Sequence, residues 1–513
     1  MESNNQNKFK RLSAIIEISA ESVADYILPD YLGDIRRILF SECQAKPSGH
    51  FSDEAGDEFS GIAVYDVLYL DSENKPTRAS FTSDFELRLK GEEGRADAIC
   101  APTVSGFYVR STGPRRFSAG ATVSAPARII VEDEITVEGD GMDMGERTQS
   151  LDGTLKVRCA ASSGKTEREF AERIERLDGA MADEVEIVYS GARANVNKAT
   201  ADGDRLKLEG ELYLYALISN DTLPIYLAEK TVPFEEWVEI DGAQRMEFIP
   251  VADVVSVTSS VNPDEEGVDV VLSAIIELWG IGEFNEIRNV SLDSFVVGAD
   301  VKNTYNDYRY TELYGVFTSV VSSAAELSSD KLCSEKIRDV PYLSGTFKGG
   351  VAFDDGDAEL CGEIRAVGVA SVVDDNGGIS YAGVKFSVPV KEKIKCENSG
   401  EASRIESEVS VCAISAAVDT ESVIVNYKLV CHGACSGTVS KRLLASSVVE
   451  PDSSANEGKS ITVYYPCEGD TLFEVAKKFR TPLSRIAAIN ELSASSAVDG
   501  ADSLCGAERL LIY

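Results

Sequence analysis

The most constraining feature of the sequence is a glycine-centred motif that occurs three times within a pattern of alternating residues. The three glycines are 149 and 152 residues apart. A turn signal precedes each motif, and its Asp-Gly or Gly-Asp pair favours a tight hairpin because glycine tolerates positive φ. Apolar and polar residues alternate after each glycine, as in a half-buried β-strand. The motifs are Phe59-Ser60-Gly61-Ile62, Leu208-Glu209-Gly210-Glu211 and Leu360-Cys361-Gly362-Glu363.

Each motif belongs to about five predicted strands joined by short turns, an arrangement typical of sandwiches. We therefore expect a mainly β fold with three repeated antiparallel β-sandwich or barrel-like domains. Helical patterns are confined to residues 165–177 and 319–327. The predicted copies span residues 1–150, 151–315 and 316–445. A polar, serine-rich linker at 446–460 is expected to tether the remaining residues flexibly.

Residues 461–513 predict a small βααβ unit. Residues 461–464 read as a strand, and Asp470 or Thr471 can cap a helix; with Thr471 as the cap, Glu474 completes a capping box. Pro482 suits the start of a second helix, for which Asn490 is a plausible stop. Residues 510–512 close the unit as a second strand. Its apolar helix positions are Leu472, Val475, Ala476, Phe479, Leu483, Ile486, Ala487 and Ile489.

This unit resembles the LysM domain. The resemblance is carried by Gly469-Asp470-Thr471-Leu472, Ala476-Lys477-Lys478-Phe479, Ile489-Asn490-Glu491-Leu492 and Gly506 shortly before Leu510. It departs from the family in a longer loop at residues 493–503, an extra residue after Gly506, and Phe473 where Trp is common.

The resemblance implies a mainly backbone-lined groove between two loops, which binds an N-acetylglucosamine-containing glycan or sometimes a protein. The alternative for Gly469, Asp470 and Thr471 is a purely structural role in the loop and helix cap. The expected glycan- or partner-binding residues are Gly469, Asp470, Thr471, Leu472, Asn490, Leu492 and Gly506.

The three copies resemble the SPOCS domain, also called DUF3794. The carrying residues in the first copy are Pro29-Asp30-Tyr31, Asp34-Ile35-Arg36-Arg37-Ile38-Leu39 and Gly113-Pro114-Arg115-Arg116-Phe117-Ser118. Three such copies followed by a LysM-like unit are similar to SipL-type proteins of endospore formers. That layout implies a spore-coat basement-layer ATPase (SpoIVA type) as the partner of the LysM domain.

Composition narrows the classes of partner. The net charge is −36, which disfavours nucleic acid and anionic membrane surfaces. No run of about 18 apolar residues is present, so no membrane insertion is expected. The start of the chain shows no export signal, and eleven scattered cysteines fit reduced thiols. These features predict a cytoplasmic protein. The resemblance to SipL-type proteins further implies a location in the mother cell, at the forespore surface.

Chemical motifs are few. Two histidines, His50 and His432, disfavour histidine-rich metal clusters and most triads. Gly164-Lys165-Thr166 lacks the first glycine of a phosphate-binding loop, so a helix-start loop is expected there. Gly433-Ala434-Cys435-Ser436-Gly437 resembles a nucleophile elbow, but no histidine follows residue 432. The alternation around Cys431 predicts a strand core position. We expect no catalytic residue, no metal and no cofactor.

Two functional hypotheses follow. The first is a non-enzymatic scaffold or adaptor in endospore envelope assembly, with the LysM-like unit docking to its protein partner. The alternative is a peptidoglycan-binding protein that grips N-acetylglucosamine glycan through the same unit.

Overall fold

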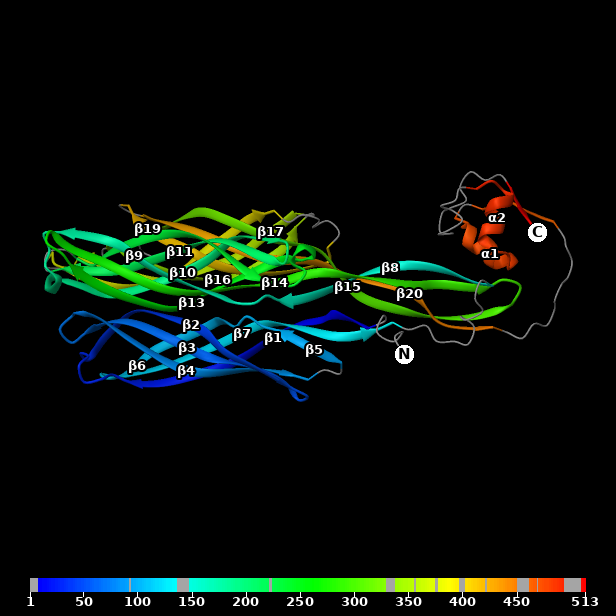
Figure 1. Ribbon diagram of the computed structural model, residues 1–513. Helices are drawn as coiled ribbons and strands as arrows, with labels where there is room; N and C mark the ends of the chain where they lie inside the picture. The colour runs from blue at the N-terminus through cyan, green and yellow to red at the C-terminus, as the bar shows by residue number, and fades with distance from the viewer. Residues whose placement is uncertain are drawn as a thin grey trace.

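The computed structural model describes residues 8–91, 94–135, 147–220, 224–328, 337–354, 357–373, 377–395, 402–419, 422–449, 461–467, 469–492 and 509–513. Antiparallel strands dominate this part of the chain, and two short helices lie near its C-terminus (Figure 1). The mainly β fold predicted from alternation is therefore confirmed.

The first copy contains two sheets. One has the strand order β2-β3-β4, and the other has the order β1-β7-β5, with β6 also paired to β7. The strands are β1 (Lys8–Ile27), β2 (Ile35–Asp53), β3 (Gly56–Asp71), β4 (Pro76–Lys90), β5 (Arg95–Ile99), β6 (Thr103–Gly113) and β7 (Arg116–Glu134).

The second copy repeats this plan with its first long strand divided in two. The sheet β10-β11-β12 faces a sheet in which β14 pairs with β13 on one side and with β8 and β9 on the other. The elements are β8 (Thr148–Ser162), β9 (Thr166–Asp178), η2 (Ala182–Glu184), β10 (Val185–Asp202), β11 (Arg205–Asn220), β12 (Tyr226–Glu239), η3 (Ala243–Arg245), β13 (Glu247–Pro263) and β14 (Gly267–Val296).

The third copy has the sheets β16-β17-β18 and β15-β20-β19. Its long strand β15 begins before residue 316, and β20 extends beyond residue 445, so both reach past the expected limits of this copy. The strands are β15 (Val301–Ser328), β16 (Ile337–Asp354), β17 (Asp357–Val373), β18 (Ile379–Ile394), β19 (Arg404–Val418) and β20 (Ser422–Val449). The C-terminal unit consists of β21 (Thr462–Tyr464), α1 (Leu472–Phe479), α2 (Leu483–Ile489) and β22 (Leu510–Ile512).

Alternation along the strands builds the cores, as the second copy shows. Every second residue of β11 is buried against every second residue of β14, so the two sheets pack face to face. The facing residues include Leu206, Leu208, Leu212, Leu214 and Ala216 of β11, and Val268, Val270, Leu272, Ala274 and Ile276 of β14.

The repeated glycine has the same steric role in every copy. A Cβ atom at Gly61 would lie 2.5 Å from the Phe85 ring, and one at Gly210 would lie 2.5 Å from the Phe234 ring. At Gly362 the ring of Phe347 would be 2.6 Å away, and a backbone carbonyl of the neighbouring strand crowds each position further. A side chain at any of these positions would displace the neighbouring strand, which explains the motif.

Two segments predicted to be helical are strands instead. Residues 165–177 fall largely in β9, and residues 319–327 fall in β15. The apolar residues Phe170, Ile174 and Leu177 are three or four positions apart, as in an amphipathic helix. They nevertheless pack on the core of the second copy, because β9 pairs along its length with β14. Tertiary pairing overrides the local pattern here.

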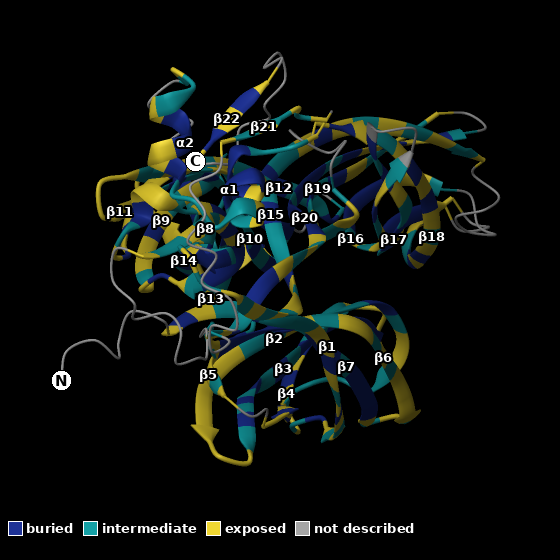
Figure 2. Cartoon of the chain, turned by 90° about the vertical axis from the view of Figure 1, so that its right-hand side faces the viewer, coloured by how far each residue is buried: buried dark blue, intermediate teal, exposed yellow. Residues whose placement is uncertain are grey.

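A polar cluster joins all three copies, which lie alongside one another (Figures 1 and 2). Glu42 of the first copy accepts hydrogen bonds from Tyr189 (2.6 Å) and Arg193 (3.3 Å) of the second and from Tyr342 (2.8 Å) of the third. Burial alone raises the pKa of Glu42, but the nearby Arg193 charge and hydrogen bonds from Ser344, Tyr189 and Tyr342 lower the pKa overall. The cluster therefore holds Glu42 ionised between the copies.

A second ionic network also links residues from all three copies. The Glu283 carboxylate accepts hydrogen bonds from Arg128 Nε at 3.1 Å and Arg158 Nε at 2.7 Å, and Arg158 Nη1 donates to Glu406 at 2.9 Å. Glu283, Arg128 and Arg158 are all buried. Each of these buried charges needs its oppositely charged partner to offset the free-energy cost of removing it from water.

Loss of Glu283 should be strongly destabilising. Glu283→Ala leaves the buried Arg128 guanidinium without this carboxylate and Arg158 with only Glu406, and we expect the free energy of unfolding to fall by about 3–5 kcal/mol. Urea denaturation measures this loss. The control is Glu86→Ala, which removes an exposed partner of Arg88 and should cost no more than about 1 kcal/mol. Equal losses in the two variants would contradict the role given to the buried network.

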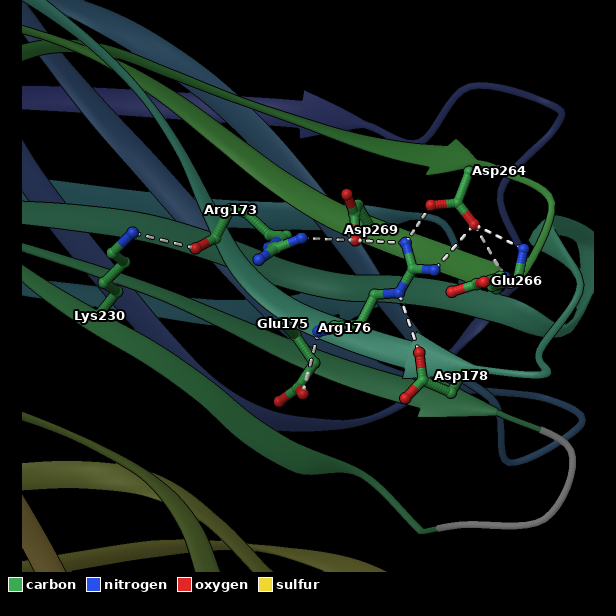
Figure 3. Close-up of polar contacts among 9 residues, drawn as sticks. Arg173, Glu175, Arg176, Asp178, Lys230, Asp264, Glu266 and Asp269 are labelled. Carbon is green, nitrogen blue, oxygen red and sulfur yellow. Dashed lines mark hydrogen bonds and ion pairs between the residues drawn. The ribbon is translucent and has the colours of Figure 1, made fainter.

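At one end of the second copy, Arg176 fastens β9 to the turn between β13 and β14 (Figure 3). Its guanidinium donates to Asp264 (2.8 Å), Asp269 (2.9 Å) and Asp178 (3.0 Å). Asp264 also accepts backbone hydrogen bonds from Glu266 and Gly267, both at 2.9 Å. The hydrogen bond from Arg176, followed by those backbone bonds, holds the pKa of Asp264 well below its usual range.

The stabilisation from Asp264 should depend on pH. Because its pKa is lower in the folded than in the unfolded state, its contribution is present above the ordinary carboxyl pKa of about 3.9 and is lost as the pH falls below it. We expect Asp264→Asn to unfold at a lower temperature than the wild type near neutral pH, with a smaller difference in acid. Thermal unfolding followed by circular dichroism tests this. Asp178→Asn, which removes a single contact to Arg176, should have a smaller effect; a difference for Asp264→Asn that is independent of pH would contradict the prediction.

Candidate functional site

The first loop of the C-terminal unit is built by local hydrogen bonds. Gly469 has φ +95°, a conformation that favours glycine. Asp470 accepts hydrogen bonds from the Cys467 amide (2.8 Å) and the Tyr464 hydroxyl (2.7 Å), and these two bonds lower its pKa. The Thr471 hydroxyl accepts the Glu474 amide at 3.2 Å, while the Glu474 carboxylate accepts the Thr471 amide at 3.0 Å. The predicted capping box is therefore confirmed.

The end of α2 is fixed to β22 by one side chain. Asn490 Nδ2 donates to the carbonyl oxygens of Ile486 and Leu511, both at 2.8 Å, and Asn490 Oδ1 accepts the Leu511 amide at 2.7 Å. This amide therefore bridges the helix and the strand. The Leu492 amide donates to Ala487 at 3.0 Å, and its half-buried side chain packs on the core of the unit.

Most of the predicted binding residues thus have structural roles for their side chains. Asp470, Thr471 and Asn490 are engaged in the bonds above, and Leu472 is fully buried. Gly469 is exposed in the first loop, whereas Gly506 lies outside the described residues. Any ligand held by the described part of these loops would contact mainly backbone groups.

The C-terminal unit packs on a two-ribbon extension that we call the stalk. The stalk consists of residues 148–155 of β8, 288–296 of β14, 301–310 of β15 and 439–449 of β20, and it projects away from the sandwiches (Figure 1). Its two ribbons share an apolar cluster of Leu155, Val157, Val290, Tyr310 and Leu443. The stalk therefore joins the second and third copies.

Specific contacts fix the unit to the tip of the stalk. The Phe473 ring meets Phe295 edge-on at 5.4 Å. Lys477 Nζ lies 2.6 Å from both carboxylate oxygens of Asp293. Arg480 pairs with Asp300, and the Leu483 amide donates to Gln149 at 2.9 Å. These contacts hold the C-terminal unit against the stalk. Of the predicted linker at residues 446–460, the first four residues belong to β20, and residues 450–460 lie outside the described residues.

This docking was missed by sequence reasoning because it joins residues far apart in the chain. In the sequence, Phe473 stands out only as a residue where LysM domains commonly have Trp. No pattern around Asp293 predicts that it contacts the C-terminal unit. Burial alone raises the pKa of Asp293, but hydrogen bonds from Lys477 and Tyr305 lower it overall.

The docking residues lie on the side of α1 and at the α1–α2 junction. The predicted ligand-facing loops lie at the opposite ends of the two helices, before α1 and after α2.

The motifs considered for chemistry have structural explanations. Lys165 lies beside Glu277 (2.6 Å), and Thr166 starts β9, so the expected helix start is wrong. Cys431 is buried in β20, as predicted, and burial raises its pKa to about 12. Cys435 is also buried in β20, where no strand-to-helix turn could form an elbow. It is disulfide-bonded, whereas seven other cysteines of the described residues are reduced thiols.

Within the residues that the structure describes, no group of three or more His, Cys, Asp or Glu side chains is arranged to hold a metal ion. Neither α1 nor α2 has the length and apolar character of a membrane-crossing helix.

The docking contact generates a test. Lys477→Ala removes the ammonium group from Asp293 and should loosen the C-terminal unit on the stalk. We expect backbone amides of α1 to exchange hydrogen several-fold faster, because a charged hydrogen bond contributes roughly 1 kcal/mol or more. The control is Lys478→Ala, whose ammonium lies over Tyr464 within the unit. Unchanged exchange in Lys477→Ala would show that this pair does not hold the unit.

Comparison with known families supports the predicted nature of this unit. Residues 468–498 match the family model of the LysM domain. Searches among curated proteins and among solved structures find no match to the chain. The resemblance of the three copies to the SPOCS domain stays a prediction. The chain thus carries a LysM domain whose helical framework is docked on a β-stalk.

Proposed function

We propose that this chain is a non-enzymatic glycan-binding protein whose LysM domain holds an N-acetylglucosamine-containing polymer such as peptidoglycan. The carrying observation is the LysM match at residues 468–498, supported by an intact loop and cap at Gly469, Asp470 and Thr471. The exposed Gly469 offers backbone N–H and C=O groups, which suit the amide and hydroxyl groups of an N-acetyl sugar.

The position of the domain also favours this proposal. The stalk contacts use Phe473, Lys477, Arg480 and Leu483, whereas the expected ligand loops precede α1 and follow α2. A glycan could approach those loops while the domain remains docked. The three sandwiches would then act as a rigid base for the stalk.

A second candidate function is the spore-envelope adaptor, with a coat ATPase of the SpoIVA type as partner and the mother-cell cytoplasm as its location. One observation favours a protein ligand. The outer face of the β21–β22 pair exposes apolar side chains, and a protein interface needs more area than a sugar groove. These residues are Ile461, Val463, Tyr465, Leu511 and Tyr513.

Glycan retention tests the first proposal. The full chain should bind insoluble peptidoglycan and chitin saturably, and soluble chitin oligomers should compete, because they carry the same N-acetyl groups. Cellulose oligomers of equal length should not compete. Sedimentation with increasing amounts of glycan measures the bound fraction.

The matched control is a chain that ends at Val449 and therefore lacks the LysM domain. It should lose glycan retention. Retention that survives this truncation, or that chitin oligomers fail to reduce, would contradict glycan binding by the LysM domain. Absence of retention by the full chain would favour a protein ligand instead.

A further inference from the structure

A cavity of about 620 Å³ lies where the three copies meet. Its walls come from β2 and the β5–β6 segment of the first copy, from β10, β13 and β14 of the second, and from β19 and β20 of the third. This volume is within the range of small-molecule sites in proteins. No single copy could form the cavity, so it exists only in the assembled chain.

The cavity is lined by an excess of negative charge. Four carboxylates, Asp97, Asp253, Glu277 and Glu408, are present in its walls, against one ammonium group, Lys165. Lys165 is already paired with Glu277 at 2.6 Å. Two histidines also line the cavity. His432 is hydrogen-bonded to Thr318 at 2.9 Å, and burial lowers its pKa to about 4, so it is neutral near pH 7; His50 is bonded to Asp57 at 2.9 Å.

Two of these carboxylates are only partly compensated: the charge of Arg128 lies near Glu408, and Lys165 and a hydrogen bond from Trp279 face Asp253. Glu408 Oε1 is buried and has no hydrogen-bond partner among the described residues. Burial raises the pKa of Glu408, and burial followed by the nearby Glu277 charge raises the pKa of Asp253 to about 6. A buried hydrogen-bond acceptor without a partner lowers the stability of the fold. A bound cation that donates a hydrogen bond would therefore stabilise this region.

Apolar walls accompany the charges. Phe59, Ile99, Val251 and Trp279 line the same cavity. A ligand that matches both features has a charged head and a hydrocarbon body. A bare metal ion matches less well, because the volume far exceeds one ion and the described residues contain no metal-binding group of three side chains.

We propose that this cavity is a binding site for a small organic ammonium compound, held by Asp253 and Glu408 with its hydrocarbon part against Trp279. The site is independent of the LysM domain and of its glycan. Its occupant would contact all three copies and would therefore stabilise their packing.

Hexamethylenediamine is a suitable probe, and hexanediol is its neutral counterpart of nearly equal size. Isothermal titration of the full chain should show one saturable site for the diamine and none for the diol. Asp253→Asn and Glu408→Gln keep side-chain size while removing charge, and each should weaken diamine binding about tenfold or more. The melting temperature should also rise with diamine in the wild type.

Non-specific attraction is the main competing explanation, because the chain has a net charge of −36. Glu54→Gln removes the same charge at an exposed residue that does not line the cavity, and it should bind the diamine like the wild type. Equal weakening in all three variants, or titration without saturation, would overturn the proposal. If Asp253→Asn fails to fold, Glu408→Gln and the diol comparison still decide it.

Discussion

The buried charge networks between the copies determine the arrangement of the whole molecule. Glu42 and Glu283 each accept hydrogen bonds from groups contributed by more than one copy. Loss of one partner, with the copies still packed, would leave a buried charge uncompensated. An apolar cluster that includes Ile130, Trp279 and Leu313 reinforces the junction. The direction of the stalk, and hence of the LysM domain, follows from this junction.

Local sequence rules predicted much of the fold. Alternation located the strands, and the glycine motif marked positions where Phe85, Phe234 and Phe347 leave no room for a side chain. The same rules failed at residues 165–177, where helical spacing of apolar residues coincides with strand pairing to β14. How the copies meet could not be predicted, because Glu42 and Arg193 look like ordinary charged residues on strands. Only the assembled structure shows that they are buried together.

The candidate site, too, could be predicted only in part from the sequence. The capping box of Thr471 and Glu474 spans four residues, so sequence alone could identify it. The docking of Lys477 on Asp293 joins residues 184 positions apart and has no local signature. The bridging role of Asn490 also changes the expected chemistry, since its amide bonds to β22. Recognition by the described loops is therefore left mainly to backbone groups.

The length of the stalk has a mechanical consequence. The part of β14 that belongs to the stalk runs from residue 288 to residue 296, roughly 30 Å at the usual rise of a strand. Force applied to the LysM domain along this axis would load the ladder hydrogen bonds in parallel, in shear, rather than opening them one at a time. Tension on the LysM domain would then be borne along the stalk while the sandwiches keep their packing.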